Sequence, residues 1–195
     1  GADRILTMDL HAGQIQGFFN IPVDELTALP LLSRYFAEKE MENVVVVGVD
    51  IGISKRARDM AERLGVPLAI VEKRRVEGND DKTELFNIIG DVDGMNAILM
   101  DDEVDTGGSM VSAAKALIAR GAVTVSASAT HGVLSGNAFA NFQTSPIEEL
   151  VCTDTMEIPL EKQNGQIKVV SIAALFGEAI HRIHSGMSVG AMFDD

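Results

Sequence analysis

The sequence predicts an α/β fold built around a parallel sheet. Three short apolar segments, within residues 5–9, 44–50 and 98–102, each run directly into an aspartate. Buried parallel strands read as short apolar runs, and open α/β sheets bind ligands at the carboxyl ends of their strands. Segments of helical periodicity separate these strands, as in repeated strand–helix units. We therefore expect Asp50 and Asp101 to lie at the same carboxyl edge of one sheet.

The remaining elements follow from apolar runs, helical periodicity and glycine stops. Gly65 and Gly121 stand where C-caps are expected, after helices that end at residues 64 and 120. Strands are expected over residues 4–9, 44–48, 67–71, 97–100, 124–129, 150–154 and 167–171. Helices are expected over residues 30–40 and 55–64, from the turn at 106–109 to residue 120, and over 135–142 and 173–184. Residues 72–83 are polar and are expected as a loop.

The composition fits a globular protein and argues against nucleic acid as a partner. The 195 residues carry a formal net charge of −13, whereas a nucleic-acid surface needs a basic face. The sequence lacks a run of about eighteen apolar residues, so neither a membrane span nor a membrane partner is expected. Residues 5–10 are too short for a signal peptide and contain Asp9. The single Cys152 cannot form an internal disulfide, which fits a cytoplasmic location.

Residues 101–109 combine a strand end, an acidic turn and a helix start. Asp101 and Asp102 follow the apolar run 97–100, and the turn then supplies Asp105, Thr106, Gly107, Gly108 and Ser109. Backbone N–H groups at a helix N-terminus form a seat for a phosphate, and glycines let the backbone approach it closely. The neighbouring carboxylates fit sugar hydroxyls or a magnesium-bound ligand. The alternative is an ordinary strand-to-helix turn in which Asp and Thr serve as caps.

Two further groups of residues carry candidate chemistry. Lys73, Arg74 and Arg75 form a cationic cluster in an otherwise acidic chain; such clusters are also found as solvated surface patches. Asp9 and His11 flank Leu10, so in an extended strand end their side chains point the same way and can share a cation. The alternative for this pair is a simple hydrogen bond.

Four stretches together carry a family resemblance. Residues 101–109 resemble the phosphate-binding signature of the phosphoribosyltransferase fold. With residues 7–19, 67–75 and 129–136, in this order, they resemble the ribose-phosphate pyrophosphokinase family over the later part of its usual length. The resemblance implies a type I phosphoribosyltransferase-like domain that binds ribose 5-phosphate over residues 29–165. It also implies that residues 1–28 are the remnant of a second, similar domain, to which the strand and helix of 166–195 return.

The resemblance implies the transfer of a diphosphoryl group from ATP to ribose 5-phosphate, with Mg²⁺ as the cofactor. The implied phosphate and ribose contacts are Asp101, Asp102, Asp105, Thr106, Gly107, Gly108 and Ser109. The implied metal ligands are His11, Asp50 and Asp9, and the implied catalytic cations are Lys73 and Arg75. The family also implies a hexamer built from dimers.

The sequence departs from the family pattern at two positions. Asn20 stands where an acidic residue is usual, and Ile53 stands where the loop usually has a glycine. A β-branched residue resists positive φ, so either the backbone at Ile53 is ordinary or diphosphate binds differently. The alternatives to this activity are a stand-alone phosphoribosyltransferase and a non-catalytic regulatory or truncated homologue. The complete phosphate turn, with Lys73 and Arg75, favours the carboxyl-terminal portion of an active enzyme.

Overall fold

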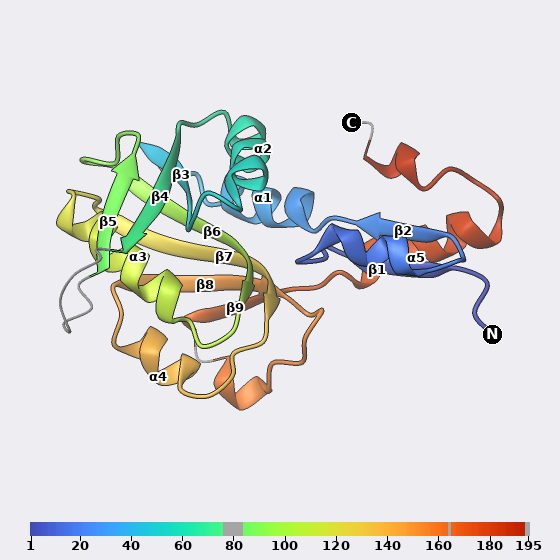
Figure 1. Cartoon of the computed structure of the whole chain (residues 1–195). Coiled ribbons are helices and arrows are strands. Elements are labelled where there is room, and N and C mark those ends of the chain that lie inside the picture. The colour runs from blue at the N-terminus through green and yellow to red at the C-terminus, as the bar shows by residue number, and fades with distance from the viewer. Residues whose placement is uncertain (76–83, 164, 194–195) are drawn as a thin grey trace. The chain divides into compact units, whose positions relative to one another are not determined.

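The computed structural model describes residues 1–75, 84–163 and 165–193, which form two compact units (Figure 1). The larger unit is Leu29–Val170, and the smaller unit combines residues 1–28 with residues 171–195. No helix in the described ranges is long and apolar enough to cross a membrane.

A mostly parallel sheet forms the centre of the larger unit. Over the described residues it has seven strands in the order β5-β4-β3-β6-β7-β8-β9. The strands are β3 (Val44–Gly48), β4 (Leu68–Arg75), β5 (Glu84–Ile89), β6 (Asn96–Val104), β7 (Thr124–Gly132), β8 (Ile147–Thr153) and β9 (Ile167–Val170). All neighbouring pairs are parallel except β4 and β5. The predicted α/β class with a parallel sheet is therefore confirmed, with one antiparallel strand at its edge.

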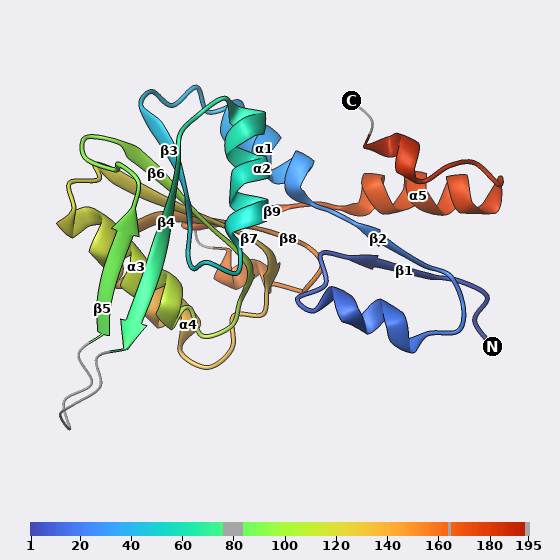
Figure 2. The same cartoon turned by 45° about the horizontal axis from the view of Figure 1, so that its top comes forward.

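Helices cover both faces of this sheet. Helices α1 (Leu29–Ala37) and α2 (Ser54–Leu64) lie on one face, and α3 (Gly108–Ala119) and α4 (Ala138–Gln143) lie on the other (Figures 1 and 2). The short 3-10 helix η2 (Leu160–Lys162) follows β8. Because both faces are covered, the inner strands can be apolar on both sides, as β3 is over Val-Val-Val-Val.

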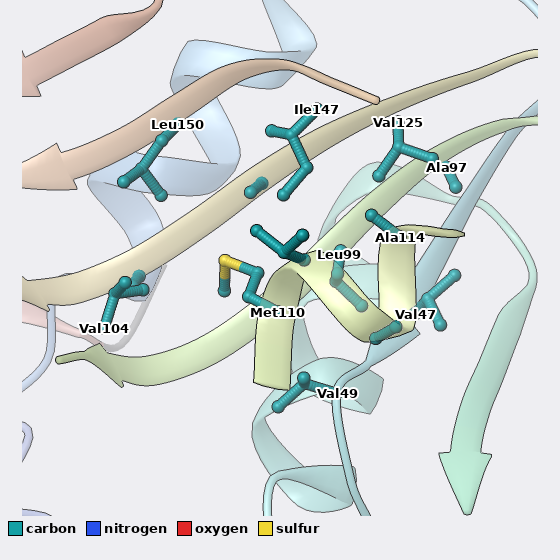
Figure 3. Close-up of a cluster of buried hydrophobic side chains, with 14 of the residues drawn as sticks. Val47, Val49, Ala97, Leu99, Val104, Met110, Ala114, Val125, Ile147 and Leu150 are labelled. Atoms are coloured by element: carbon teal, nitrogen blue, oxygen red, sulfur yellow. The ribbon is translucent and has the colours of Figure 1, made fainter. Parts of the chain in front are cut away.

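The core under α3 fixes the centre of the sheet. Met110 and Ala114 of α3 pack against Leu99 and Val125 of the central strands, all fully or nearly fully buried (Figure 3). Phe142 of α4 belongs to the same cluster and is fully buried. This packing holds the carboxyl end of β6 and the start of α3 on one rigid base.

Two features of the larger unit differ from the sequence prediction. Residues 72–75 continue β4 instead of opening a loop, because Glu72 to Arg75 pair with β5, a strand that was not predicted. Residues 167–170, expected to leave with the last helix, pair in parallel with β8 and belong to the large sheet. Residues 76–83, the rest of the predicted polar loop, lie outside the described residues.

The smaller unit contains a two-stranded parallel sheet and one α-helix among its described residues. Strands β1 (Ile5–Met8) and β2 (Val23–Leu26) pair along their length, and the 3-10 helix η1 (Gly13–Phe18) connects them. Helix α5 (Ala173–His184) spans the predicted residues, and η3 (Gly190–Met192) follows it. Strand β2 was missed because its sequence, Val-Asp-Glu-Leu, has no clear apolar run.

Candidate active site

The carboxyl ends of β3 and β6 place acidic side chains next to one another. The two strands pair in parallel with Gly48 opposite Met100, and the Val49 N–H donates to the Met100 carbonyl at 3.1 Å. Asp50 and Asp101 therefore follow neighbouring strands at the same edge of the sheet. The prediction that these aspartates share one edge is confirmed.

The Asp101 carboxyl is crowded by burial and by negative charge. Burial raises its pKa to about 7, and the charges of Asp102 and Asp50 act in the same direction. The Asp102 N–H donates to Asp101 Oδ1 at 2.9 Å and opposes this shift in pKa. A carboxyl group in this setting is relieved by a proton, by a cation or by hydroxyl donors. The edge is thus suited to a ligand that brings positive charge or sugar hydroxyls.

Asp50 also organises the turn into α2. Its Oδ1 accepts a hydrogen bond from the Ile53 N–H at 3.1 Å. Ile53 has φ −82° and ψ −2° and is buried, so its backbone is ordinary and positive φ is not needed. Of the two alternatives left open by the sequence, the ordinary backbone is therefore the correct one. A Cβ added at Gly48 would lie 2.9 Å from Ile70 Cδ1 and 3.0 Å from Ile53 Cγ2, so a side chain at this strand end would require these two side chains to shift.

Strand β6 continues past the predicted end at residue 100 as far as Val104. Among the residues that the structure describes, the extension pairs with β7 alone, with Asp101 opposite Ala129 and Val104 opposite Gly132. Asp101 and Asp102 therefore stand on a paired strand rather than in a turn. Pairing with residues 129–132 of β7 outweighs the low strand propensity of the aspartates.

The turn after β6 leads into α3 through a glycine with positive φ. Gly107 has φ 74° and ψ 0°, and α3 begins at Gly108. A Cβ at Gly107 would lie 2.7 Å from Phe142 Cε2, so only glycine fits there. Thr106, Gly108 and Ser109 are exposed, whereas Gly107 is buried. Of the two glycines of the turn, Gly107 has positive φ and Gly108 does not.

The predicted catalytic cations lie on the β4–β5 hairpin. Lys73 is exposed on β4, opposite Phe86 of β5. Arg75 is the last residue of β4 and pairs with Glu84, and its side chain is outside the described part of the structure. Lys73 thus starts from a paired strand, which is a firmer base than the predicted loop.

The smaller unit gives Asp9 a structural contact. Asp9 has φ 42°, so the chain turns there, and the expected extended strand end across Asp9 and His11 is wrong. The Asp9 carboxylate is buried and accepts the Ala28 N–H at 2.9 Å. His11 is exposed, and the Leu10 N–H before it donates to Glu25 Oε1 at 2.9 Å. Glu25 was not predicted, because its role depends on pairing between β1 and β2.

Two other polar residues have partners that explain them. His131 Nδ1 lies 2.9 Å from Thr155 Oγ1, so this ring nitrogen is engaged in a hydrogen bond within the fold. Asp24 forms a bidentate contact with Arg4, which holds the pKa of that carboxyl below its usual value. Within residues 1–75, 84–163 and 165–193, no three His, Cys, Asp or Glu side chains are placed to hold a metal by themselves.

The fold and the edge define a class: a mostly parallel α/β domain with a glycine-containing turn from strand to helix beside neighbouring aspartates. Comparison with known proteins narrows this class. A model described as the phosphoribosyl synthetase-associated domain matches residues 77–194. The chain belongs to this family.

Relatives at high identity agree with this assignment. The chain is 56% identical over 194 residues to the ribose-phosphate pyrophosphokinase of Caldanaerobacter subterraneus subsp. tengcongensis, covering 99% of the chain and 61% of that protein. It is 50% identical to the enzyme of that name from Clostridium acetobutylicum, covering 100% of the chain and 61% of the relative. A crystal structure of phosphoribosylpyrophosphate synthetase from Mycobacterium smegmatis matches with a TM-score of 0.87 at 40% identity, covering 95% of the chain and 60% of that structure. The chain thus spans about three fifths of the length of these relatives.

Proposed function

We propose that the chain is part of a ribose-phosphate diphosphokinase, which makes phosphoribosyl pyrophosphate and AMP from ATP and ribose 5-phosphate for nucleotide biosynthesis. In this reaction the anomeric hydroxyl oxygen attacks the β-phosphorus of ATP. A new oxygen–phosphorus bond forms, the bond from the β-phosphorus to the AMP oxygen breaks, and the hydroxyl proton is lost. The names of the relatives at 50–56% identity support this reaction.

The observation that carries the proposal is the phosphate turn beside the carboxylates. Thr106 to Ser109 open α3, whose N-terminal N–H groups and positive dipole end suit the 5-phosphate. Asp101 and Asp102 stand just before this turn and would accept hydrogen bonds from the ribose hydroxyls. A site with N–H donors for a phosphate at one end and carboxylate acceptors for hydroxyl groups at the other fits a sugar phosphate better than it fits a free phosphate or a free sugar.

The acidic edge also fits Mg²⁺ in the type of its ligands. Mg²⁺ in phosphoryl-transfer sites is typically held by one or two carboxylates together with substrate phosphates, so a cage of three protein ligands is not required. Asp50 lies close enough to Asp101 for its charge to raise the Asp101 pKa, and a cation would relieve that repulsion. Bound Mg²⁺ would neutralise charge on the ATP phosphates. We propose Asp50 as its protein contact in the larger unit. His11 and Asp9, the other ligands that the family resemblance implies, belong to the smaller unit, where the Asp9 carboxylate accepts the Ala28 N–H.

Lys73 and Arg75 are proposed to offset the negative charge that develops on the transferred group. Such transfers depend on positioning and charge stabilisation more than on covalent chemistry. A cation on a paired strand is well suited to this role because its backbone is already ordered. We further propose that the complete protein is a cytoplasmic hexamer built from dimers, to be tested by light scattering on a full-length form.

Two alternative functions can be distinguished from a diphosphokinase. A stand-alone phosphoribosyltransferase would use the same turn but has no need for the Lys73–Arg75 pair. A non-catalytic homologue would tolerate loss of the cradle geometry, whereas Gly107 keeps the positive φ that the turn requires.

The test is the formation of AMP from ATP in the presence and absence of ribose 5-phosphate. It compares this chain with a parent extended to the length of the relatives, and with the parent carrying Lys73→Ala. We expect AMP release that depends on ribose 5-phosphate in the parent, far slower release from the 195-residue chain, and loss of activity on Lys73→Ala. A parent that releases no AMP but consumes phosphoribosyl pyrophosphate with a base would favour the stand-alone transferase instead.

A further inference from the structure

One neighbouring segment, residues 134–142, holds the backbone of the phosphate turn. The Ser135 N–H donates to the Asp105 carbonyl at 3.1 Å, and the Asn141 side-chain amide donates to the Thr106 carbonyl at 2.9 Å. The Ser135 hydroxyl also donates to the Asp105 carboxylate. Two consecutive carbonyl groups of the turn are therefore fixed by residues about 30 positions later in the chain.

These carbonyls determine the direction of two N–H groups. In a trans peptide unit the C=O and N–H bonds point in opposite directions, and the described residues contain no cis peptide. The Asp105 carbonyl shares its peptide unit with the Thr106 N–H, and the Thr106 carbonyl shares its unit with the Gly107 N–H. Both N–H groups consequently point away from segment 134–142, where they can donate to an anion.

The segment that provides this support is itself firmly held. The Leu134 N–H donates to the Val104 carbonyl at 3.0 Å, and Leu134 is buried with φ 49°, a conformation that few leucines adopt. At the other end, Phe142 is fully buried in the core and its ring packs against Gly107. Ser135 and Asn141 thus sit between two anchored residues, so they can impose an orientation on the turn.

We infer that Ser135 and Asn141 are positioning residues of the ribose 5-phosphate site, which orient the Thr106 and Gly107 N–H groups toward the phosphate. The inference rests on the proposed function, because it assigns a phosphate to those N–H groups. Asn141 carries the larger share. Its side-chain amide donates to the Thr106 carbonyl, whereas Ser135 also holds Asp105 through its own backbone N–H, which a side-chain substitution leaves in place.

A matched pair of charge-changing variants tests this role. Asn141→Asp replaces the donor with a carboxylate that repels the Thr106 carbonyl. Asn137→Asp adds the same charge four residues earlier, at an exposed position whose side chain makes no capping hydrogen bond. Calorimetry on the 195-residue chain should show at least a tenfold weaker affinity for ribose 5-phosphate in Asn141→Asp than in Asn137→Asp, because a hydrogen bond to a charged group is misdirected. Ser135→Ala should weaken binding by a smaller factor than Asn141→Asp.

Further measurements separate positioning from a general loss of structure. In the extended parent, Asn141→Asp should raise the KM for ribose 5-phosphate and leave the KM for ATP unchanged. Asn141→Ala, paired with Asn137→Ala, repeats the comparison without a new charge, so a folding defect of the aspartate variant does not decide the result. Equal affinities within both pairs, in a chain that binds ribose 5-phosphate, would overturn the positioning role alone. Absence of ribose 5-phosphate binding by the unmodified chain would overturn the proposed function and this role with it.

Discussion

Replacing Gly107 with alanine should destabilise the protein through two separable effects. The residue has φ 74°, and an L-residue in the left-handed region costs about 1–2 kcal/mol. The new Cβ would also lie 2.7 Å from Phe142 Cε2, and Phe142 is fully buried and cannot move aside freely. Overpacking of this kind typically costs about 1–3 kcal/mol. We therefore expect the free energy of unfolding to fall by about 2–5 kcal/mol.

The adjacent glycine provides the control. At Gly108 φ is not positive, and an added Cβ would meet only Thr106 Oγ1 at 3.7 Å, an ordinary contact distance. Because alanine favours the helix that begins there, Gly108→Ala should be neutral or stabilising by about 0.5–1 kcal/mol. Urea unfolding followed by circular dichroism measures both variants. The two substitutions are chemically identical and differ by one position, so opposite signs would isolate the local geometry.

A double substitution distinguishes the steric effect from the backbone effect. Phe142→Leu removes the ring atoms that crowd Gly107, so Gly107→Ala should cost less in that background than in the unmodified chain. The cost that remains measures the left-handed backbone. Equal stability of Gly107→Ala and Gly108→Ala, or no coupling with Phe142→Leu, would refute this explanation of the turn.

Three further predictions concern the acidic edge and the cation. The Asp101 pKa is raised from 3.8 to about 7, so the carboxyl favours folding most below about pH 4, and that contribution is lost as pH rises through 7. At pH 8.5 the free energy of unfolding of Asp101→Asn should thus exceed that of the unmodified chain by at most about 4 kcal/mol. Denaturation curves should show this difference shrinking toward pH 4. A difference that does not change with pH would contradict the raised pKa of Asp101. Asp50→Ala removes the hydrogen bond to the Ile53 N–H, so the free energy of unfolding should fall by about 1 kcal/mol. Asp50→Asn keeps an oxygen acceptor and should retain most of that stability, but the parent carrying it should lose Mg²⁺-dependent activity. Lys73→Ala should change the affinity for ribose 5-phosphate, measured by calorimetry, by no more than about twofold. Activity of the parent should fall by about a hundredfold or more, as on removal of one charge-stabilising group. Unchanged activity would exclude the proposed role of Lys73.

The sequence predicted elements whose stability is encoded locally. The run of valines in β3 and the helical periodicity of α5 predicted the observed bounds of both elements. A short continuous apolar run is typical of a buried strand, and apolar residues spaced three or four apart are typical of a helix. Strand β5 was missed because its pairing with β4 and the packing of Phe86 and Ile88 on the core stabilise it. These contacts depend on tertiary structure, which overrides local propensity.

The candidate site shows the same division. The Asp101–Ser109 stretch could be recognised because strand, turn and helix start are contiguous. Which of its two glycines has positive φ was not predicted, since residue type is the same at Gly107 and Gly108. The supports of that turn were not predicted, since Ser135 and Asn141 are remote from it in sequence. Residues 129–136 contributed to the family resemblance, but nothing in their pattern indicated a contact between Ser135 and Asp105. Asp9 was misjudged for a related reason. Its turn and its bond to the Ala28 N–H depend on where β2 ends, and β2 itself was not predicted.

The unequal pairing of β6 along its length has a consequence for motion in the site. Up to Met100 the strand is paired on both sides, with β3 and β7, and beyond Met100 it pairs with β7 alone within the part of the chain that the structure describes. Amide hydrogens of residues 97–100 should therefore exchange with solvent only when the whole domain opens, whereas those of 101–104 should exchange through smaller openings. Asp101 and Asp102 stand at the boundary between the part of β6 that is paired on both sides and the part that is paired on one side. A ligand bound there would slow amide exchange most in residues 101–104. Binding could therefore be followed as a decrease in local opening of this end of the strand.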